Sequence, residues 1–395
     1  MALSRGQSGL LFFSLLTIAV GQSLVFALLA PLGREVQLSE VQITSIIAIS
    51  AAIYGWISPA WGRYSDHRGR KPVLLIGLAG FTVGIILFAS VFQAALMGVL
   101  MGLPLYLLAI VTRCMQSSIM AATPPACSAY AADLTQPDER MGAMAQLGAA
   151  NSLGTILGPA VSGALATLGL LAPLYFAGLL TAVAGLLVWR LLPAIPAVAR
   201  KSHAQRTRLR YRDPRIFRFI AAAVVMFSGF GAIQQTLGFT IQDRLALSGV
   251  ATAQYTGGAF MVAAIASFIA QGVVLQKVKL PPEQFVLAGL GCMLLSAGFI
   301  ASFQEMGYLL VGMAFIGLGT GLALPSISAA ASMAVSPDEQ GAVAGLVASS
   351  PAIGFVAGPI IGGLLYQQDS AYPSVFSGAV FVLVFVQLVL SRRQV

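Results

Sequence analysis

Residues 154–163 read GTILGPAVSG, and 200 positions later residues 354–363 read GFVAGPIIGG. The flanking residues repeat in the same register, since Pro-Asp-Glu at 137–139 recurs at 337–339. Both segments lie in long apolar runs, where glycines let helix backbones approach each other closely. A chain of 395 residues that repeats at half its length is expected to form two similar helical units. Transporters can work by rocking one such unit against the other, so the repeat indicates transport.

The composition places the chain in a lipid bilayer. Hydrophobic residues make up 58% of the chain and charged residues 9%, whereas soluble domains carry about 25% charged residues. A helix needs about 20 apolar residues to cross the hydrocarbon core, and it satisfies its own backbone groups there. We therefore predict an all-α membrane protein with two pseudo-symmetric six-helix bundles. The apolar runs predict twelve spans, at residues 10–32, 41–61, 72–93, 104–132, 139–167, 170–193, 216–241, 252–276, 283–303, 307–334, 339–366 and 373–391.

The basic residues predict the orientation of these spans. All of the 22 Lys and Arg residues except Arg34, Arg113 and Arg244 fall on the side that both termini share. Because loops rich in Lys and Arg remain in the cytoplasm, both termini are predicted to be cytoplasmic, in a bacterial inner membrane. The net charge of +9 follows from this bias and gives no reason to expect nucleic-acid binding.

A basic segment divides the chain into two halves. We predict that residues 194–214 form a cytoplasmic linker between an N-terminal six-helix bundle at 1–193 and a C-terminal six-helix bundle at 215–395. The linker is either a solvated segment attracted to anionic lipid headgroups or a site at which a regulator binds.

The loop between the second and third spans carries a distinctive motif. Residues 61–72 read WGRYSDHRGRKP. A generic cytoplasmic loop explains the basic residues, but it does not explain Asp66 between Gly62 and Gly69. The pattern resembles the signature loop of the major facilitator superfamily, and in particular its drug:proton antiporter branch with twelve spans, to which tetracycline and multidrug efflux proteins belong. The resemblance covers essentially the whole chain and implies the major facilitator fold.

The resemblance also implies that this loop is a conformational latch. Asp66 would face the N-terminus of span eleven near Gly341, where the helix dipole favours a carboxylate. Arg70 would pair with Asp133 at the end of span four. The corresponding loop of the second half has Gln276 in place of the Asp, so we expect a strong latch only in the first half. The predicted latch residues are Gly62, Asp66, Gly69, Arg70, Lys71 and Asp133.

Spans five and eleven carry the repeated glycine–proline pattern. The antiporter branch has the pattern Gly-x8-Gly-x3-Gly-Pro-x2-Gly-Gly, which span eleven fits completely, whereas span five has Ala145 and Ser162 where glycine is expected. Proline removes a backbone donor and kinks a helix, so the resemblance implies a bend that seals the cytoplasmic side of an exporter. Close packing alone explains the glycines equally well. The predicted helix-bend residues are Gly154, Gly158, Pro159, Gly163, Gly345, Gly354, Gly358, Pro359, Gly362 and Gly363.

Arg113 lies well inside span four, three residues before Gln116. An arginine at that depth is costly and should face a cavity or a polar partner. Its surroundings resemble the family's Arg-x-x-Gln-Gly motif, with Ser117 in place of Gly, and the resemblance implies a role in proton coupling. No Asp or Glu falls near the centre of a predicted span, although a buried carboxylate is the usual proton carrier. Either a carboxylate near a span end, such as Glu35 or Asp243, carries the proton, or Arg113 meets an anionic group of the substrate.

The predicted substrate cavity follows from this charge distribution. A cavity with one cation and no central anion should disfavour cationic drugs and accept neutral, zwitterionic or anionic amphiphiles. Packing between helices explains each candidate contact about as well as substrate binding does. The candidate cavity residues are Gln22, Phe26, Arg113, Gln116, Asn151, Gln234, Gln235 and Phe239.

Together these patterns predict a secondary active transporter, in first place a proton-coupled exporter of a small amphiphilic molecule such as a drug or siderophore. A proton-coupled importer or an uncoupled facilitator of a small organic solute is the alternative. The chain contains no His-Glu-x-x-His, Gly-x-Ser-x-Gly or Gly-x4-Gly-Lys-Ser/Thr motif. We therefore expect no enzymatic activity and no metal, cofactor or ATP site. We expect a monomer whose partners are its substrate, protons and the bilayer.

Overall fold

The computed structural model describes residues 3–136, 140–194, 211–336 and 339–392. In these ranges all regular structure is helical, as the composition predicted, and no strand is present. The chain divides into two compact units, and α2 and α9 contribute residues to both of them. The first unit is Met1–Gln42, Ile49–Ser202 and Gly249–Gly257, and the second is Ile43–Ala48, His203–Ser248 and Gly258–Val395.

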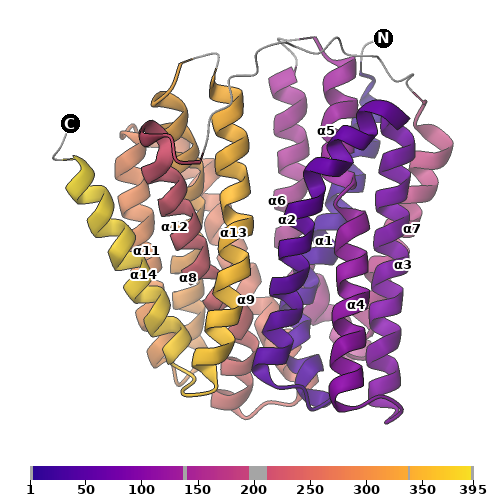
Figure 1. Cartoon of the computed structure of the whole chain (residues 1–395). Helices are drawn as coiled ribbons and strands as arrows, with labels where there is room; N and C mark the ends of the chain where they lie inside the picture. Colours follow the sequence, from indigo (N-terminus) through magenta and orange to yellow (C-terminus); the bar gives the residue numbers. More distant parts are fainter. Residues whose placement is uncertain (1–2, 137–139, 195–210, 337–338, 393–395) are drawn as a thin grey trace. The chain divides into compact units, whose positions relative to one another are not determined.

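Figure 1 shows the helices of the first half. Their bounds lie close to those of the predicted spans. In this unit α1 packs along α6 and α7, and α3 packs along α4 and α7. A short 3₁₀ turn, Ala166–Leu168, follows α6. The helices are α1 (Arg5–Glu35), α2 (Glu40–Arg68), α3 (Arg70–Leu96), α4 (Gly102–Met120), α5 (Thr123–Leu134), α6 (Arg140–Leu165) and α7 (Ala172–Leu191).

The second half repeats this order of helices, except that its fourth span is one continuous helix and its second span contains a π turn. Its ninth helix passes into one π turn, Ala270–Val274, before a last helical turn, α10. In this unit α8 packs along α13 and α14, and α11 packs along α12 and α14. The helices are α8 (Pro214–Leu245), α9 (Gly249–Ile269), α10 (Leu275–Lys277), α11 (Pro282–Ser302), α12 (Met306–Met333), α13 (Gln340–Tyr366) and α14 (Tyr372–Arg392).

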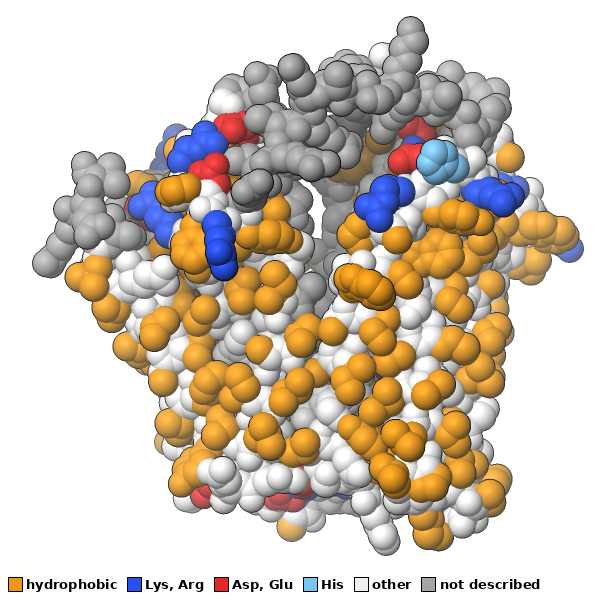
Figure 2. Space-filling view, in the orientation of Figure 1, with side chains coloured by type: hydrophobic (Ala, Val, Ile, Leu, Met, Phe, Trp, Pro, Cys, Tyr) orange, Lys and Arg blue, Asp and Glu red, His pale blue; other side chains and the backbone are white. Residues whose placement is uncertain are grey.

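Eleven helices of the described chain are long and apolar enough to cross a membrane. They correspond to eleven of the twelve predicted spans. The remaining predicted span, 139–167, is occupied by α6, which is 26 residues long but is not one of the eleven. Large apolar side chains are exposed on the long faces of the helices, whereas Lys and Arg gather near their ends (Figure 2). This surface is the reverse of a soluble protein's and suits contact with lipid.

Serine residues set the starts of the first two helices. Ser4 accepts a hydrogen bond from the backbone N–H of Gln7 at 3.2 Å, and the Gln7 side chain accepts one from the Ser4 N–H at 2.9 Å. Ser39 and Gln42 make the same reciprocal pair at the start of α2. Each pair is a capping box, which satisfies two N–H groups that the first turn of a helix leaves open.

Span four differs from the prediction because it is two helices. The sequence predicted one helix over 104–132, but α4 ends at Met120 and α5 begins at Thr123. Pro124 and Pro125 follow the break, and two consecutive prolines remove two N–H groups from the helical ladder. Proline also disfavours helical geometry in the residue before it. The equivalent α12 has Leu324 before its single Pro325 and continues without a break.

Two side chains of α2 take up carbonyl groups that this break leaves open. The Trp61 indole N–H donates to the Ser118 carbonyl at 2.7 Å, and the Ser58 hydroxyl donates to the Ala121 carbonyl at 3.5 Å. In a continuous helix the Ala121 carbonyl would accept from residue 125, which is a proline without an N–H. The break is therefore supported by α2, the helix in which the motif of residues 61–72 begins.

The repeated glycines hold equivalent helix pairs together in the two units. A Cβ at Gly154 of α6 would stand 2.7 Å from the Leu16 carbonyl oxygen in α1. A Cβ at Gly354 of α13 would likewise stand 2.7 Å from the Val224 carbonyl oxygen in α8. Neither site has room for a side chain, so glycine is required at both for the backbones to pack this closely.

The next glycines along these helices make the same contacts. A Cβ at Gly158 would stand 2.6 Å from the Val20 carbonyl oxygen of α1. A Cβ at Gly358 would meet the Ser228 carbonyl oxygen of α8. The α1–α6 interface gains a hydrogen bond as well, because the Ser23 hydroxyl donates to the Gly154 carbonyl at 3.1 Å.

Candidate functional site

Arg113 is a buried cation in the first unit, on α4. Only 2% of the residue is exposed. Its Nη1 donates to Oε1 of Gln116 at 2.6 Å, and its Nη2 donates to Oε1 of Gln22 on α1 at 2.9 Å. The guanidinium carbon also lies 5.8 Å from the centre of the Phe88 ring on α3, within the range of a cation–π contact. Two neutral amides and an aromatic ring thus hold the charge, in the place where the sequence predicted a polar partner.

Two donors of this cluster have no hydrogen-bond partner among the residues that the structure describes. They are Nε of Arg113 and Nε2 of Gln116, and both atoms are buried. An arginine can only donate, so the two amides must turn their oxygens toward it and their NH₂ groups away from it. A buried donor without a partner costs roughly 1–3 kcal/mol. The cluster therefore carries a positive charge and further donors, and its amide oxygens are already in use.

Gly84 of α3 positions Gln116. A Cβ at Gly84 would stand 2.5 Å from Cβ of Gln116 and 2.8 Å from its Cα. A Cβ at Gly80 would meet the Ile119 side chain of the next turn of α4. Because α3 presents glycines at these two positions, α4 packs directly on its backbone. This close packing places Gln116 of the Arg113 cluster directly against α3.

At one end of the first unit, Arg70 joins three helices. Its Nε donates to Oδ2 of Asp133 on α5 at 2.9 Å, which is the predicted pairing. Its Nη1 contacts Oδ1 of Asp66 at 2.6 Å and donates to the Ser65 hydroxyl at 2.7 Å, both on α2. Arg70 is 7% exposed, so these bonds are made largely out of water, where charged pairs interact most strongly.

The other predicted latch residues shape this corner. Gly69 joins α2 to α3 with φ 91°, a conformation that glycine adopts without strain. Lys71 donates to the Trp189 carbonyl at the end of α7, at 2.8 Å. A Cβ at Gly62 would stand 3.7 Å from Pro125 of α5, which is ordinary contact. Gly69 is thus conformationally required, whereas Gly62 is not sterically confined.

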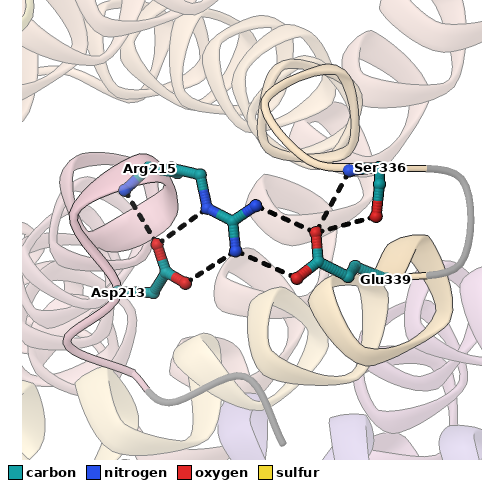
Figure 3. A network of polar contacts seen from close by, with 4 residues as sticks. All are labelled: Asp213, Arg215, Ser336 and Glu339. Atoms are coloured by element: carbon teal, nitrogen blue, oxygen red, sulfur yellow. Dashed lines mark hydrogen bonds and ion pairs between the residues drawn. The ribbon is translucent and has the colours of Figure 1, made fainter. Parts of the chain in front are cut away.

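The second unit has an ion network of its own at a different position. Arg215, in the first turn of α8, donates to Asp213 through Nε and Nη2 at 3.1 and 2.9 Å. It also donates to Glu339, just before α13, through Nη1 and Nη2 at 2.9 and 3.0 Å (Figure 3). Ser336 completes the network by donating to Glu339 at 2.9 Å. The expectation that only the first half latches strongly concerned the loop at Gln276, which is not part of this network, so it stays a prediction.

This network keeps both carboxylates ionised. Hydrogen bonds from Arg215 and Ser336 lower the pKa of Glu339 from its ordinary value to about 2. Hydrogen bonds from Arg215 also lower the pKa of Asp213. A lowered pKa means that the ion pair contributes its stability at pH values above the ordinary carboxylate pKa and loses it only in strong acid.

The chain matches a known family along nearly its whole length. The family model described as Major Facilitator Superfamily matches residues 11–306 and 279–394. The chain belongs to the Major Facilitator Superfamily. Multidrug resistance protein 1 of Bacillus subtilis (strain 168) is 28% identical over 386 residues, 93% of this chain and 92% of that protein.

Two further comparisons agree with this membership. The class D tetracycline resistance protein of Salmonella ordonez is 28% identical over 365 residues, 89% of this chain and 87% of that protein. The crystal structure of the nucleoside transporter NupG (D323A mutant) superimposes with a TM-score of 0.77 at 13% identity, covering 96% of this chain and 98% of that one. This superfamily member is therefore a transporter and not an enzyme, with the fold that the sequence predicted.

Of the remaining cavity candidates in the first unit, only Phe26 lies near the Arg113 cluster in sequence, one turn after Gln22 and half-buried. Asn151 does not join the cluster: it is exposed on α6, and its backbone carbonyl accepts a hydrogen bond from the Thr155 hydroxyl. Glu35 is exposed at the end of α1, next to an ion pair between its neighbour Arg34 and Glu40.

The candidates in the second unit separate into a polar pair and an aromatic pair. Gln234 and Gln235 are buried in α8, with Oε1 of the first and Nε2 of the second unpaired. Phe239 is fully buried, with its ring 5.5 Å from that of Tyr366, so packing explains it. The Tyr366 hydroxyl donates to Oδ2 of Asp243 at 2.7 Å, and Asp243 itself is exposed at the end of α8.

The helix-bend candidates lie as predicted in two long helices. Pro159 is inside α6 and Pro359 is inside α13. Gly362 follows Gly358 against α8, where its Cβ would stand 3.0 Å from Cα of Ala232. The surroundings of Gly345 lie outside the described residues.

Sequence reasoning missed Trp61 as a capping side chain and missed the Arg215 network. A signal for the network was present, because Glu339 belongs to the repeated Pro-Asp-Glu tripeptide and Asp213-Pro214 is a typical helix start. The capping by Trp61 had no such signal. It depends on a carbonyl 57 residues away that becomes free only when α4 ends.

Proposed function

We propose that this Major Facilitator Superfamily protein is a proton-coupled exporter of a small amphiphilic molecule. The observation that supports export is a repeated close contact: Gly154 and Gly158 pack against the backbone of α1, and Gly354 and Gly358 pack against the backbone of α8. Because these positions have no room for a side chain, each unit can form a tight helix pair that excludes water. Export is also supported by the similarity to proteins named for multidrug and tetracycline resistance.

The proposed machine consists of two six-helix bundles, 1–193 and 215–395, joined by the basic linker 194–214. It works as a monomer, with both termini in the cytoplasm. The orientation is supported by the gathering of Lys and Arg on the side of the termini, since such loops are retained in the cytoplasm. Rocking of the bundles would expose the substrate site to each side in turn.

The Arg70 network is the proposed latch of this motion. Its supporting observation is that one guanidinium bonds Asp66, Ser65 and Asp133 and so ties α2 and α3 to α5. Breaking that tie requires a charged group to lose several hydrogen bonds at once, which gives two discrete states rather than a gradual change. Proton coupling is assigned to Arg113 together with a carboxylate at the end of a span, Glu35 or Asp243.

Inside-out membrane vesicles test this function. With an acidified lumen, vesicles that contain the protein should accumulate tetracycline, and a protonophore should stop the accumulation. Vesicles with Arg70→Ala should accumulate less than native ones. Accumulation only in right-side-out vesicles, or accumulation that the protonophore does not affect, would contradict proton-coupled export.

A further inference from the structure

The buried atoms of the Arg113 cluster that have no hydrogen-bond partner among the described residues are both donors. Oε1 of Gln116 and Oε1 of Gln22 are both occupied by the guanidinium. Nε of Arg113 and Nε2 of Gln116 are buried and unpaired, and both are donors. A group that completes this cluster must therefore accept hydrogen bonds from these two donors.

The charge of the cluster leads to the same requirement. Arg113 is 2% exposed, and its described hydrogen-bond partners are amides, which carry no charge. An arginine within the bilayer is normally paired, because an isolated charge there costs several kcal/mol. A neutral acceptor would satisfy the donors but would leave this cost in place. An anionic acceptor satisfies both requirements.

The walls of the cluster favour an aromatic or otherwise apolar body on that anion. The Phe88 ring lies against the guanidinium, with its centre 5.8 Å from the guanidinium carbon. The absence of a side chain at Gly84 lets the backbone and Cβ of Gln116 lie directly on α3. Gln22 is the partly exposed member of the cluster, and it lies on α1, one turn before the half-buried Phe26.

From these observations we propose that Arg113, Gln116 and Gln22 form a binding site for the carboxylate of an amphiphilic organic anion. The countercharge of Arg113 is then supplied by the transported molecule. This inference rests on the proposed function only in taking the ligand to be cargo, since binding itself requires no proton gradient. Cationic amphiphiles are rejected, because they meet a buried positive charge.

Three probes of the same shape test the site with the full chain in lipid nanodiscs: 2-naphthoate, 2-naphthamide and 2-naphthylmethylammonium. The native protein should bind naphthoate at least about tenfold more tightly than the amide, because charge-assisted hydrogen bonds contribute most to such differences. It should bind the ammonium compound more weakly than the amide. Equal affinity for naphthoate and naphthamide would overturn the proposal.

The sharpest variant is Gln22→Glu. It places a carboxylate where an amide oxygen now lies 2.9 Å from Arg113, so the protein carries its own countercharge and should lose the preference for naphthoate. Gln7→Glu is the matched control on the same helix, because glutamate is also accepted in the capping box that Gln7 forms. Retained naphthamide binding shows that each variant is folded. An unchanged naphthoate preference in Gln22→Glu would contradict the site.

Arg113→Lys and Arg113→Gln complete the series. The lysine variant should keep part of the preference for the anion, whereas the glutamine variant should bind the acid and the amide alike. The vesicle experiment separates this inference from the proposed function. Selective naphthoate binding without proton-driven export would contradict only the proposed function. Proton-driven export without a preference for the carboxylate would contradict only the proposed binding site.

Discussion

The two units share the positions at which glycines pack closely on a neighbouring helix, but they do not share their buried polar groups. A Cβ at Gly154 or at Gly354 would stand at the same distance from a carbonyl oxygen of the facing helix, so both units pack this helix pair in the same way. The first unit adds a buried arginine and a broken fourth span, whereas the equivalent α12 is continuous and the second unit buries two glutamines. The comparison teaches that the repeat preserves the scaffold, while polar chemistry has become specific to each unit.

The largest expected effect tests whether the two scaffolds are equivalent. Gly158→Val and Gly358→Val should each destabilise the protein by about 3 kcal/mol, because a side chain there meets backbone atoms that cannot move aside. Thermal unfolding in detergent measures the loss. Gly148→Val on α6 is the control, since nothing lies within 4 Å of its Cβ position. If the two variants lost different amounts of stability, the two glycine positions would not be equivalent.

A second prediction contrasts the two ion networks. Arg70→Ala should cost about 2–3 kcal/mol, because it removes charged hydrogen bonds from a buried site and leaves Asp133 without this partner. Arg215→Ala should cost less, since Arg215 is 47% exposed and water replaces its bonds. Thermal unfolding at low and high salt separates the two variants. A larger loss for Arg215→Ala would reverse the proposed ranking of the networks.

The broken fourth span gives a third prediction. Trp61→Phe should cost about 1 kcal/mol, since the Ser118 carbonyl loses its donor while the ring volume is nearly kept. Trp189→Phe is a suitable control, because Trp189 is 58% exposed and its side chain makes no hydrogen bond in the described structure. Thermal unfolding compares the two. Equal stability of both variants would mean that the break does not depend on α2.

The smallest effect concerns pH. The pKa of Glu339 is lowered to about 2, so its ion pair is fully formed above the ordinary carboxylate pKa and is lost only as pH falls toward 2. Glu339→Gln should therefore leave the pH dependence of transport unchanged between about pH 5 and 8, although it weakens the network. A shifted transport profile in inside-out vesicles would make Glu339 a proton carrier.

Much of the fold followed from local patterns along the chain. The length of each apolar run predicted where the helices lie, and the glycine spacing predicted which helices can pack closely. The pairing of Arg70 with Asp133 was also foreseen, although from a family resemblance. The break after Met120 was missed because the apolar run over 104–132 continues through Pro124 and Pro125 and was taken as one helix.

The sequence by itself determined that this chain spans a membrane as two related helical halves, because apolar length and small-residue spacing act within single helices. Only the tertiary structure decided how the polar groups are satisfied. Gln22 reaches Arg113 across 91 residues, and Trp61 reaches Ser118 across 57. Hydrogen bonds act over about 3 Å in space, so their partners depend on which helices pack side by side and not on separation along the chain.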